Sequence, residues 1–179
     1  MRTISLHNKQ FKSHISDEAI EAAILNVSNQ INRDYKGKKP LFLGILNGSF
    51  LFVADLMRKI DLECEISFLK ISSYSGTSTT GTIKELVGLN EDVSGRDLII
   101  LEDIVDTGIT IDSIFKSLLG MGANSIEVAT LLFKPDSYQM AYPIKYAALE
   151  VGNEFLVGFG LDYDGLGRNL KDIYIINED

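Results

Sequence analysis

A short apolar run that ends in acidic residues limits the possible folds of this chain more than any other feature. Residues 98–101 are all apolar, Glu102 and Asp103 follow directly, and Asp106 comes three residues later. An uninterrupted apolar run is typical of a parallel strand that helices cover on both faces. We therefore expect an α/β fold in which a buried central strand carries acids to its C-terminal edge.

A threonine-glycine turn follows these acids and leads into a helical pattern. The turn consists of Thr107, Gly108, Ile109 and Thr110. Backbone N–H groups at such a turn and at a helix N-terminus bind phosphate, while carboxylates accept hydrogen bonds from hydroxyl groups. A strand end that is acidic without function is the alternative, but three carboxylates beside a buried strand are costly unless they meet a cation or a hydrogen-bond donor. The sequence thus predicts a ligand that carries both hydroxyls and a phosphate.

Further apolar runs and helical patterns alternate along the chain. Ser16 caps a predicted helix with an apolar face, and the run at 40–46 ends at Asn47 and Gly48 before a helical pattern at 49–60. Strand, turn and helix in this order form the first half of a βαβ unit. This alternation predicts a mostly parallel central sheet flanked by helices. Its further strands are expected at 63–71, 125–133 and 146–150, with a closing edge strand at 173–176.

A run of small and polar residues at 72–82 interrupts this pattern. Tyr74 is its one aromatic residue, so the run cannot contribute to a core. It is either a disordered hairpin tip without function or a mobile lid over a site, and its length favours the lid. Residues 83–87 form the predicted returning strand.

Composition excludes several classes of protein. The 179 residues favour a single domain, 1–179. A net charge of −8 argues against a main role in holding nucleic acid. Cys64 is the one cysteine, so an intrachain disulfide or a cysteine zinc cluster is impossible. Because no run approaches the roughly 20 apolar residues of a membrane span and no signal peptide is evident, we expect a cytoplasmic enzyme or regulator.

Residues 102–110 read as two acids, two apolar residues, Asp, Thr, Gly, a variable residue and Thr. This order resembles the phosphoribosyl-diphosphate signature of the type I phosphoribosyltransferases. Residues 5–177 are similar to one branch of that family, the hypoxanthine-guanine phosphoribosyltransferases. The resemblance implies the type I phosphoribosyltransferase fold, with a flexible flap at about 73–88 and a small hood built from the N-terminal and C-terminal segments. It also implies Mg²⁺ as cofactor, and phosphoribosyl diphosphate and a 6-oxopurine base as substrates.

The resemblance assigns the acids and the turn to the sugar and its phosphate. Glu102 and Asp103 would hold the ribose hydroxyls and Mg²⁺, and Asp162 would help to hold a second Mg²⁺. Asp106 would be the general base and acid at N7 of the purine. The turn at 107–110 would cradle the 5-phosphate.

The diphosphate and the closure of the site are assigned to other parts of the chain. Asn47 and Gly48 would bind the diphosphate through backbone N–H groups, and Arg168 would lie beside it. Many relatives carry a basic residue in place of Asn47, so only a backbone contribution is expected there. Ser73 and Tyr74 match a pair that folds over the reaction centre and excludes water.

Three residues are assigned to the base. Lys134, which follows the strand at 125–133, would donate to the exocyclic oxygen, although a lysine at a strand end is also typical of a solvated cap. Phe155 would stack on the purine ring, although a core position is the more common one for phenylalanine. The backbone of Leu156 would read the edge of the base.

Together these roles imply purine salvage, in which 5-phosphoribose moves to N9 of hypoxanthine or guanine to give IMP or GMP and diphosphate. One alternative is a regulator of the same fold that binds nucleotide without turnover, which would need a basic face or an added nucleic-acid-binding segment. A receiver-type signalling domain would explain Glu102 and Asp103 but not the phosphate-binding turn. Relatives are dimers or tetramers, so we expect a homodimer or homotetramer with no nucleic-acid or membrane partner.

Overall fold

A six-stranded sheet forms the centre of the molecule. The computed structural model describes residues 2–71, 86–87 and 89–177. Neighbouring strands are parallel except for the β4–β5 pair, and the order is β5-β4-β3-β6-β7-β8. The predicted α/β class with a mostly parallel sheet is confirmed. The strands are β3 (Leu41–Leu46), β4 (Glu65–Ile71), β5 (Leu86–Val87), β6 (Asp97–Val105), β7 (Ser125–Phe133) and β8 (Tyr146–Glu150).

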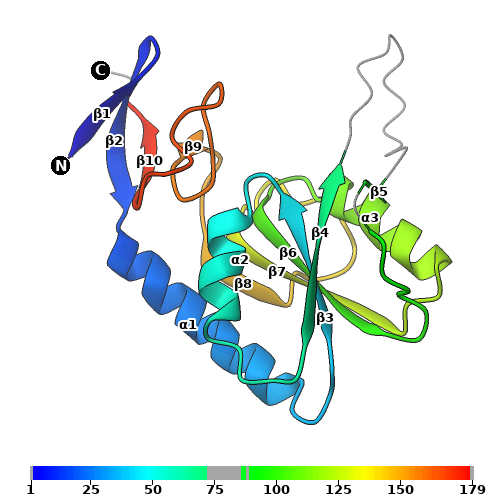
Figure 1. Ribbon diagram of the computed structural model, residues 1–179. Helices are drawn as coiled ribbons and strands as arrows, with labels where there is room; N and C mark the ends of the chain where they lie inside the picture. The colour runs from blue at the N-terminus through cyan, green and yellow to red at the C-terminus, as the bar shows by residue number, and fades with distance from the viewer. Residues whose placement is uncertain (1, 72–85, 88, 178–179) are drawn as a thin grey trace, which may run out of the picture.

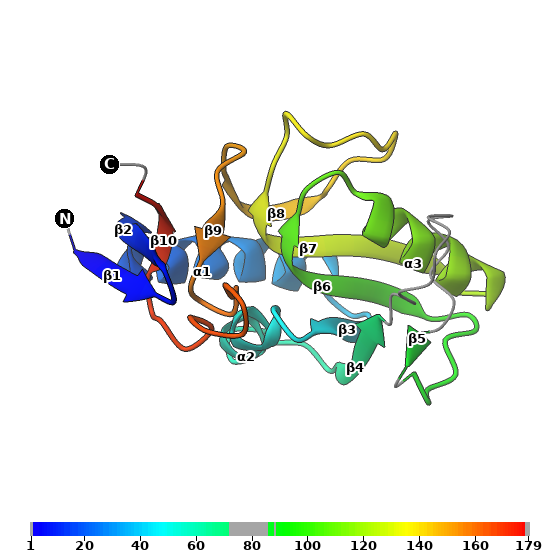
Figure 2. The same cartoon turned by 90° about the horizontal axis from the view of Figure 1, so that it is seen from above.

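Helices cover both faces of this sheet, as Figure 2 shows for α1 and α3. Alternate residues of β6 point to opposite faces, as in any strand. Ile99 and Leu101 join the core cluster under α1 and α2, whereas Leu98 and Ile100 join the cluster under α3. Within the described parts of the chain, no helix is both long and apolar enough to cross a membrane. The helices are α1 (Asp17–Asp34), α2 (Phe50–Met57) and α3 (Ile109–Gly120).

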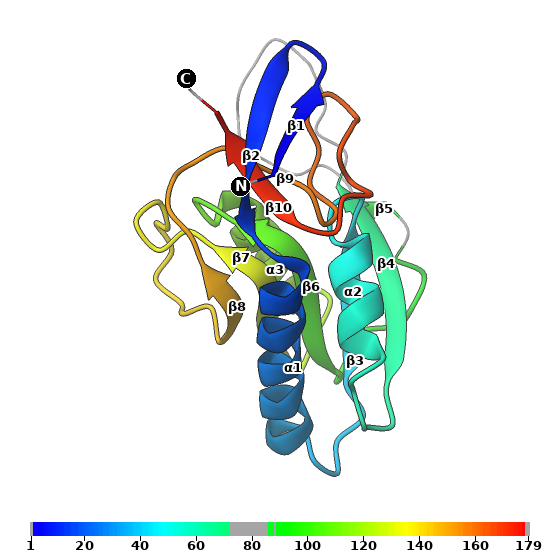
Figure 3. The same ribbon diagram turned by 90° about the vertical axis from the view of Figure 1, so that its left-hand side faces the viewer.

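The N-terminal and C-terminal segments form a second, antiparallel sheet, the hood, at the end to which the parallel strands point (Figures 1 and 3). Its order is β1-β2-β10-β9, so the expectation that residues 173–176 form an edge strand is wrong. The β1–β2 hairpin was not predicted, because Phe11 is the only fully buried residue of β2. The strands are β1 (Thr3–Leu6), β2 (Lys9–Ile15), β9 (Leu156–Val157) and β10 (Ile173–Ile176).

The predicted flap falls mostly outside the described residues. Of residues 73–88, the structure describes only Leu86–Val87 (β5), which pairs antiparallel with β4 as expected for the end of the returning strand. The assigned pair Ser73 and Tyr74 lies outside the described residues.

Candidate active site

The central strand β6 runs through the first two acids rather than ending before them. Its pairing with β7 continues as far as Val105, so Glu102 and Asp103 are strand residues and point to opposite sides. Glu102 faces the cavity at the start of α3. Asp103 instead faces the loop between β3 and α2, where its carboxylate meets the backbone of Gly48. The strand therefore presents one carboxylate to each face of the sheet at its C-terminal end.

Glu102 is the most perturbed of these acids. Its side chain is buried, with a residue exposure of 8%, and it accepts a hydrogen bond from the backbone N–H of Asp103 at 3.3 Å. Burial raises the pKa of Glu102 well above its usual range, and the neighbouring charge of Asp103 adds to the rise. A cation bound at this position would favour the ionised carboxylate and reverse that effect.

The turn after β6 lines a cavity of about 210 Å³ together with Glu102 and Asp106. Gly108 is the N-cap of α3 and has φ +83°, a conformation that glycine adopts without strain. The N–H groups of the first turn of α3 and the positive end of the helix dipole therefore border the same space as the hydroxyl-bearing turn. The other residues that line this cavity are Ile45, Ile104, Val105, Thr107, Thr110 and Ile111.

Asp106 and Lys134 form an ion pair across the ends of two neighbouring strands. The Nζ of Lys134 lies 3.1 Å from Oδ2 of Asp106, and the backbone N–H of Lys134 donates to the carbonyl of Val105 at 2.9 Å. Lys134 is only 8% exposed, so it is not the solvated cap that a strand-end lysine often is. A buried cation beside a half-exposed carboxylate can donate to one atom of a ligand while the carboxylate accepts from the next.

Three parts of the chain meet at Gly48. The peptide bond between Leu46 and Asn47 is cis. A Cβ placed on Gly48 would collide with the carboxylate of Asp103, and one placed on Gly160 would collide with the carbonyl of Gly48. Asn47 and Gly48 therefore lie between the acids of β6 and the segment that follows β9.

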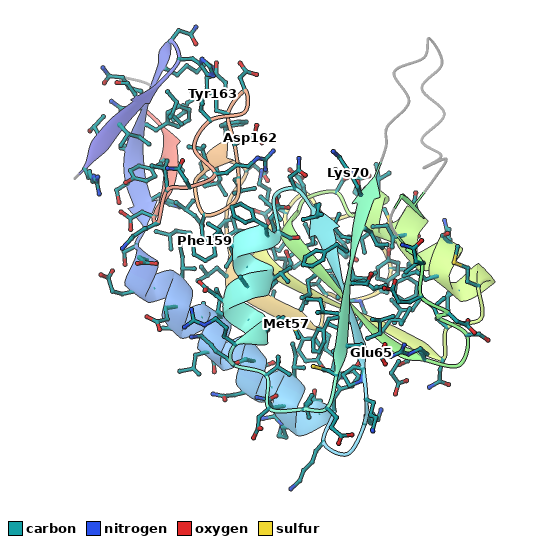
Figure 4. All side chains as sticks on the ribbon, in the orientation of Figure 1. Met57, Glu65, Lys70, Phe159, Asp162 and Tyr163 are labelled. Atoms are coloured by element: carbon teal, nitrogen blue, oxygen red, sulfur yellow. The ribbon has the colours of Figure 1, made fainter. Side chains whose placement is uncertain are left out.

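Asp162 and Arg168 are joined to each other on that segment. Figure 4 shows Asp162 beside the hood, on the segment after β9. The Nη2 of Arg168 lies 2.6 Å from Oδ1 of Asp162, and its Nη1 donates to the carbonyl of Gly160 at 2.7 Å. The backbone N–H of Gly165 donates to the other oxygen of Asp162 at 2.7 Å. Arg168 is thus fixed in place, with Gly160 linking it to Gly48.

Phe155 stands at the hood rather than in the core. Its ring is 48% exposed and lies edge-on to Tyr163, with 5.8 Å between ring centroids, and tilted to Phe11 at 6.4 Å. Leu156 is buried in β9 and pairs with Ile175 of β10. An exposed ring supported by two further aromatic rings can accept a planar ligand on its free face.

The family model for the phosphoribosyl transferase domain matches residues 13–164 of this chain. That span covers most of the sequence. The chain belongs to the phosphoribosyltransferase family. It is 40% identical over 165 residues to a hypoxanthine-guanine phosphoribosyltransferase of Streptococcus mutans, covering 92% of both chains. It is 41% identical over 154 residues to that of Streptococcus pyogenes, covering 86% of both. Its fold matches a hypoxanthine phosphoribosyltransferase of Staphylococcus aureus with a TM-score of 0.84 at 37% identity, over 93% of this chain and 91% of that one.

The acids of this phosphoribosyltransferase fit a divalent cation. Among the described residues, neither Glu102 nor Asp103 forms an ion pair with a lysine, arginine or histidine. The described part of the chain also contains no group of three histidine, cysteine, aspartate or glutamate side chains that could hold a metal ion. One or two carboxylates suffice when substrate phosphates and water complete the coordination.

Sequence reasoning missed residues that support the site of this phosphoribosyltransferase. Gly160 links Arg168 to Gly48, yet its sequence surroundings carry no signal for this contact. Phe11 and Tyr163 support Phe155 from a strand and a loop that are distant in sequence. No local pattern in the sequence predicts either contact.

Proposed function

We propose that this phosphoribosyltransferase transfers 5-phosphoribose from phosphoribosyl diphosphate to N9 of hypoxanthine or guanine, giving IMP or GMP and diphosphate. The observation that carries the proposal is the cavity at the end of β6, where Glu102, Asp106 and the turn at 107–110 meet. Relatives named for this activity, at 40% and 41% identity, support it as well. The comparisons give no support to a regulator without turnover.

The Lys134–Asp106 pair suits the oxygen-bearing edge of a 6-oxopurine. On that edge the exocyclic oxygen and N7 are neighbours, so the ammonium can donate to the oxygen while the carboxylate faces N7. As N9 attacks C1 of the ribose, Asp106 accepts the proton that N7 loses. Adenine carries an amino group at position 6, which the donor-only Lys134 would oppose. Phe155 would stack on the ring, and the backbone of Leu156 would read its remaining edge.

The sugar and its 5-phosphate would lie between the acids and the turn. Thr107, Thr110 and the N–H groups at the start of α3 hold the phosphate, and Gly108 permits its close approach. Glu102 and Asp103 accept hydrogen bonds from the ribose hydroxyls, and their charge favours the positive character that develops on the ribose as the C1–O bond breaks. Mg²⁺ held at these two acids would neutralise charge on the departing diphosphate.

The diphosphate would leave past Asn47, Gly48 and Arg168. The guanidinium of Arg168 presents a planar fork of donors that matches phosphate oxygens. Asp162 is a proposed ligand of a second Mg²⁺. Its two carboxylate oxygens already accept hydrogen bonds from Arg168 and from the N–H of Gly165, so they would have to bind the metal ion in addition to these donors. Ser73 and Tyr74 would close over the reaction centre.

We also propose a cytoplasmic homodimer or homotetramer. An exposed apolar surface supports self-association, because Phe50, Ile66 and Phe68 are each 40% exposed and border one groove between α2 and β4. Light scattering tests this part of the proposal, and a monomer at all concentrations would contradict it.

Initial rates on four bases test the proposed activity. With phosphoribosyl diphosphate and Mg²⁺, we expect nucleotide to form with hypoxanthine or guanine and adenine to be the poorest substrate. The rate with xanthine shows whether the pocket also accepts a third 6-oxopurine base. Binding of IMP without formation of nucleotide from any base would contradict the proposal and favour the regulator.

A further inference from the structure

The segment between β7 and β8, drawn in yellow in Figure 2, packs against the turn at 107–110. We propose that Tyr138 on this segment is a positioning residue that holds the turn in the conformation that binds the 5-phosphate. This inference rests on the proposed function and extends it to a residue that touches neither base nor sugar.

The side chain of Tyr138 fills the space directly beside Gly108. A Cβ placed on Gly108 would lie 2.5 Å from Cε2 of Tyr138 and 2.8 Å from Cγ of Met140. The backbone N–H of Gln139, between these two residues, donates to the carbonyl of Thr107 at 3.1 Å. The turn is therefore supported from behind by one ring, one thioether chain and one backbone hydrogen bond.

Tyr138 is itself anchored on two sides. Its ring meets that of Phe133 edge-on, with 5.2 Å between centroids, and its hydroxyl donates to the carbonyl of Tyr142 at 2.8 Å. Tyr142 in turn stacks on Phe115 of α3 at 4.9 Å. Phe133 is the last residue of β7, so the ring of Tyr138 rests on the end of that strand.

Loss of the Tyr138 ring should weaken binding of the 5-phosphate and not binding of the base. A turn binds an anion tightly only when its N–H groups already converge on it, because ordering them during binding costs affinity. Removing the ring would leave Gly108 with Met140 as its one remaining side-chain neighbour and free the turn to take other conformations. The contacts of Lys134 and Asp106 with a base do not pass through this ring, so affinity for an unphosphorylated nucleoside should be unaffected.

Affinities for IMP and inosine, measured by calorimetry on the whole chain, separate these two effects. For Tyr138→Ala we expect the dissociation constant of IMP to rise between about tenfold and a hundredfold, and that of inosine to stay unchanged. Tyr138→Phe keeps the ring beside Gly108 and loses only the hydrogen bond to Tyr142, so it should lose less IMP affinity than Tyr138→Ala. Gln139→Ala is the matched control, since it truncates an exposed side chain of the same segment, keeps the backbone N–H that donates to Thr107 and leaves Tyr138 and Met140 beside Gly108, and its ratio of the two affinities should not change.

A Tyr138→Ala variant that binds both IMP and inosine like the wild type would overturn the inference. A variant that loses affinity for both ligands by the same factor would also overturn it. If Tyr138→Ala does not fold by circular dichroism, Met140→Ala tests the same face of Gly108 with the same expected and contrary results. The wild type serves to separate the two proposals. If the wild type forms IMP and the affinities of Tyr138→Ala are unchanged, only the role of Tyr138 is refuted. If the wild type neither forms nor binds IMP, the proposed function is refuted.

Discussion

Replacement of Gly48 by alanine tests how closely the loop at Asn47 and Gly48 and the acids of β6 depend on each other. The new Cβ would lie 2.6 Å from Cγ of Asp103, whereas ordinary contacts begin at 3.4 Å. Because Oδ2 of Asp103 overlaps the new Cβ even more closely than Cγ does, the carboxylate would have to move by at least about 1 Å, and a misplacement of about 1 Å costs about 100-fold in rate. The same movement would disturb the hydrogen bond of 2.8 Å that Asp103 accepts from the N–H of Ile104. We expect kcat/KM for phosphoribosyl diphosphate to fall by at least about 100-fold.

Steady-state rates at saturating hypoxanthine measure this effect. Gly120→Ala is the control, because among the described residues nothing lies within 4 Å of a Cβ at Gly120, and it should keep wild-type activity. The double variant Gly48→Ala with Asp103→Ala should be no slower than Asp103→Ala alone, since the first change acts through the carboxylate that the second removes. Wild-type kcat/KM in a folded Gly48→Ala protein would refute the argument, and so would fully additive losses in the double variant.

Three further predictions concern single carboxylates and the buried lysine. Asp106→Asn should lower kcat by about 10² to 10⁴ while leaving IMP binding mostly intact, and a wild-type rate would remove Asp106 as the general base. Lys134→Met should narrow the ratio of kcat/KM between hypoxanthine and adenine, because it removes the donor that distinguishes them; an unchanged ratio would contradict that role. Hydrogen bonds from Ser125 and Asn124 hold the pKa of Asp97 in the folded protein below its usual range. The ionised carboxylate of Asp97 therefore stabilises the fold above the unfolded pKa of about 3.9, and this stabilisation is lost as the pH falls through the lower pKa of the folded state. In urea unfolding, the stability difference between wild type and Asp97→Ala should therefore be constant from about pH 7 to 5 and shrink below about pH 4, and a difference independent of pH would be contrary to this account.

The elements with strong periodicity were predictable from the sequence. The run at 40–46, the strand at 125–133 and the helix capped by Ser16 all exist near their expected bounds, because their burial on the sheet agrees with their local pattern. The extension of β6 through Glu102 was not predictable, since two acids inside a buried strand contradict the local rule. Such conflicts are expected where a site has to hold a charged ligand.

Contacts between distant segments account for the other errors. The place of β10 inside the hood depends on pairing with β2, which is about 160 residues earlier and carries one fully buried side chain, and no local pattern encodes that pairing. The packing of Tyr138 on Gly108 was likewise invisible, because an isolated tyrosine in a loop has no periodicity. The candidate acids and the turn were identifiable because they are consecutive in sequence.

A crystal structure of the protein with phosphoribosyl diphosphate and Mg²⁺ tests the central claim most directly. The account predicts the 5-phosphate on the turn at 107–110 and the ribose hydroxyls within hydrogen-bond distance of Glu102 or Asp103. A ribose phosphate bound elsewhere, or bound at the turn with both acids directed away from the sugar, would contradict it.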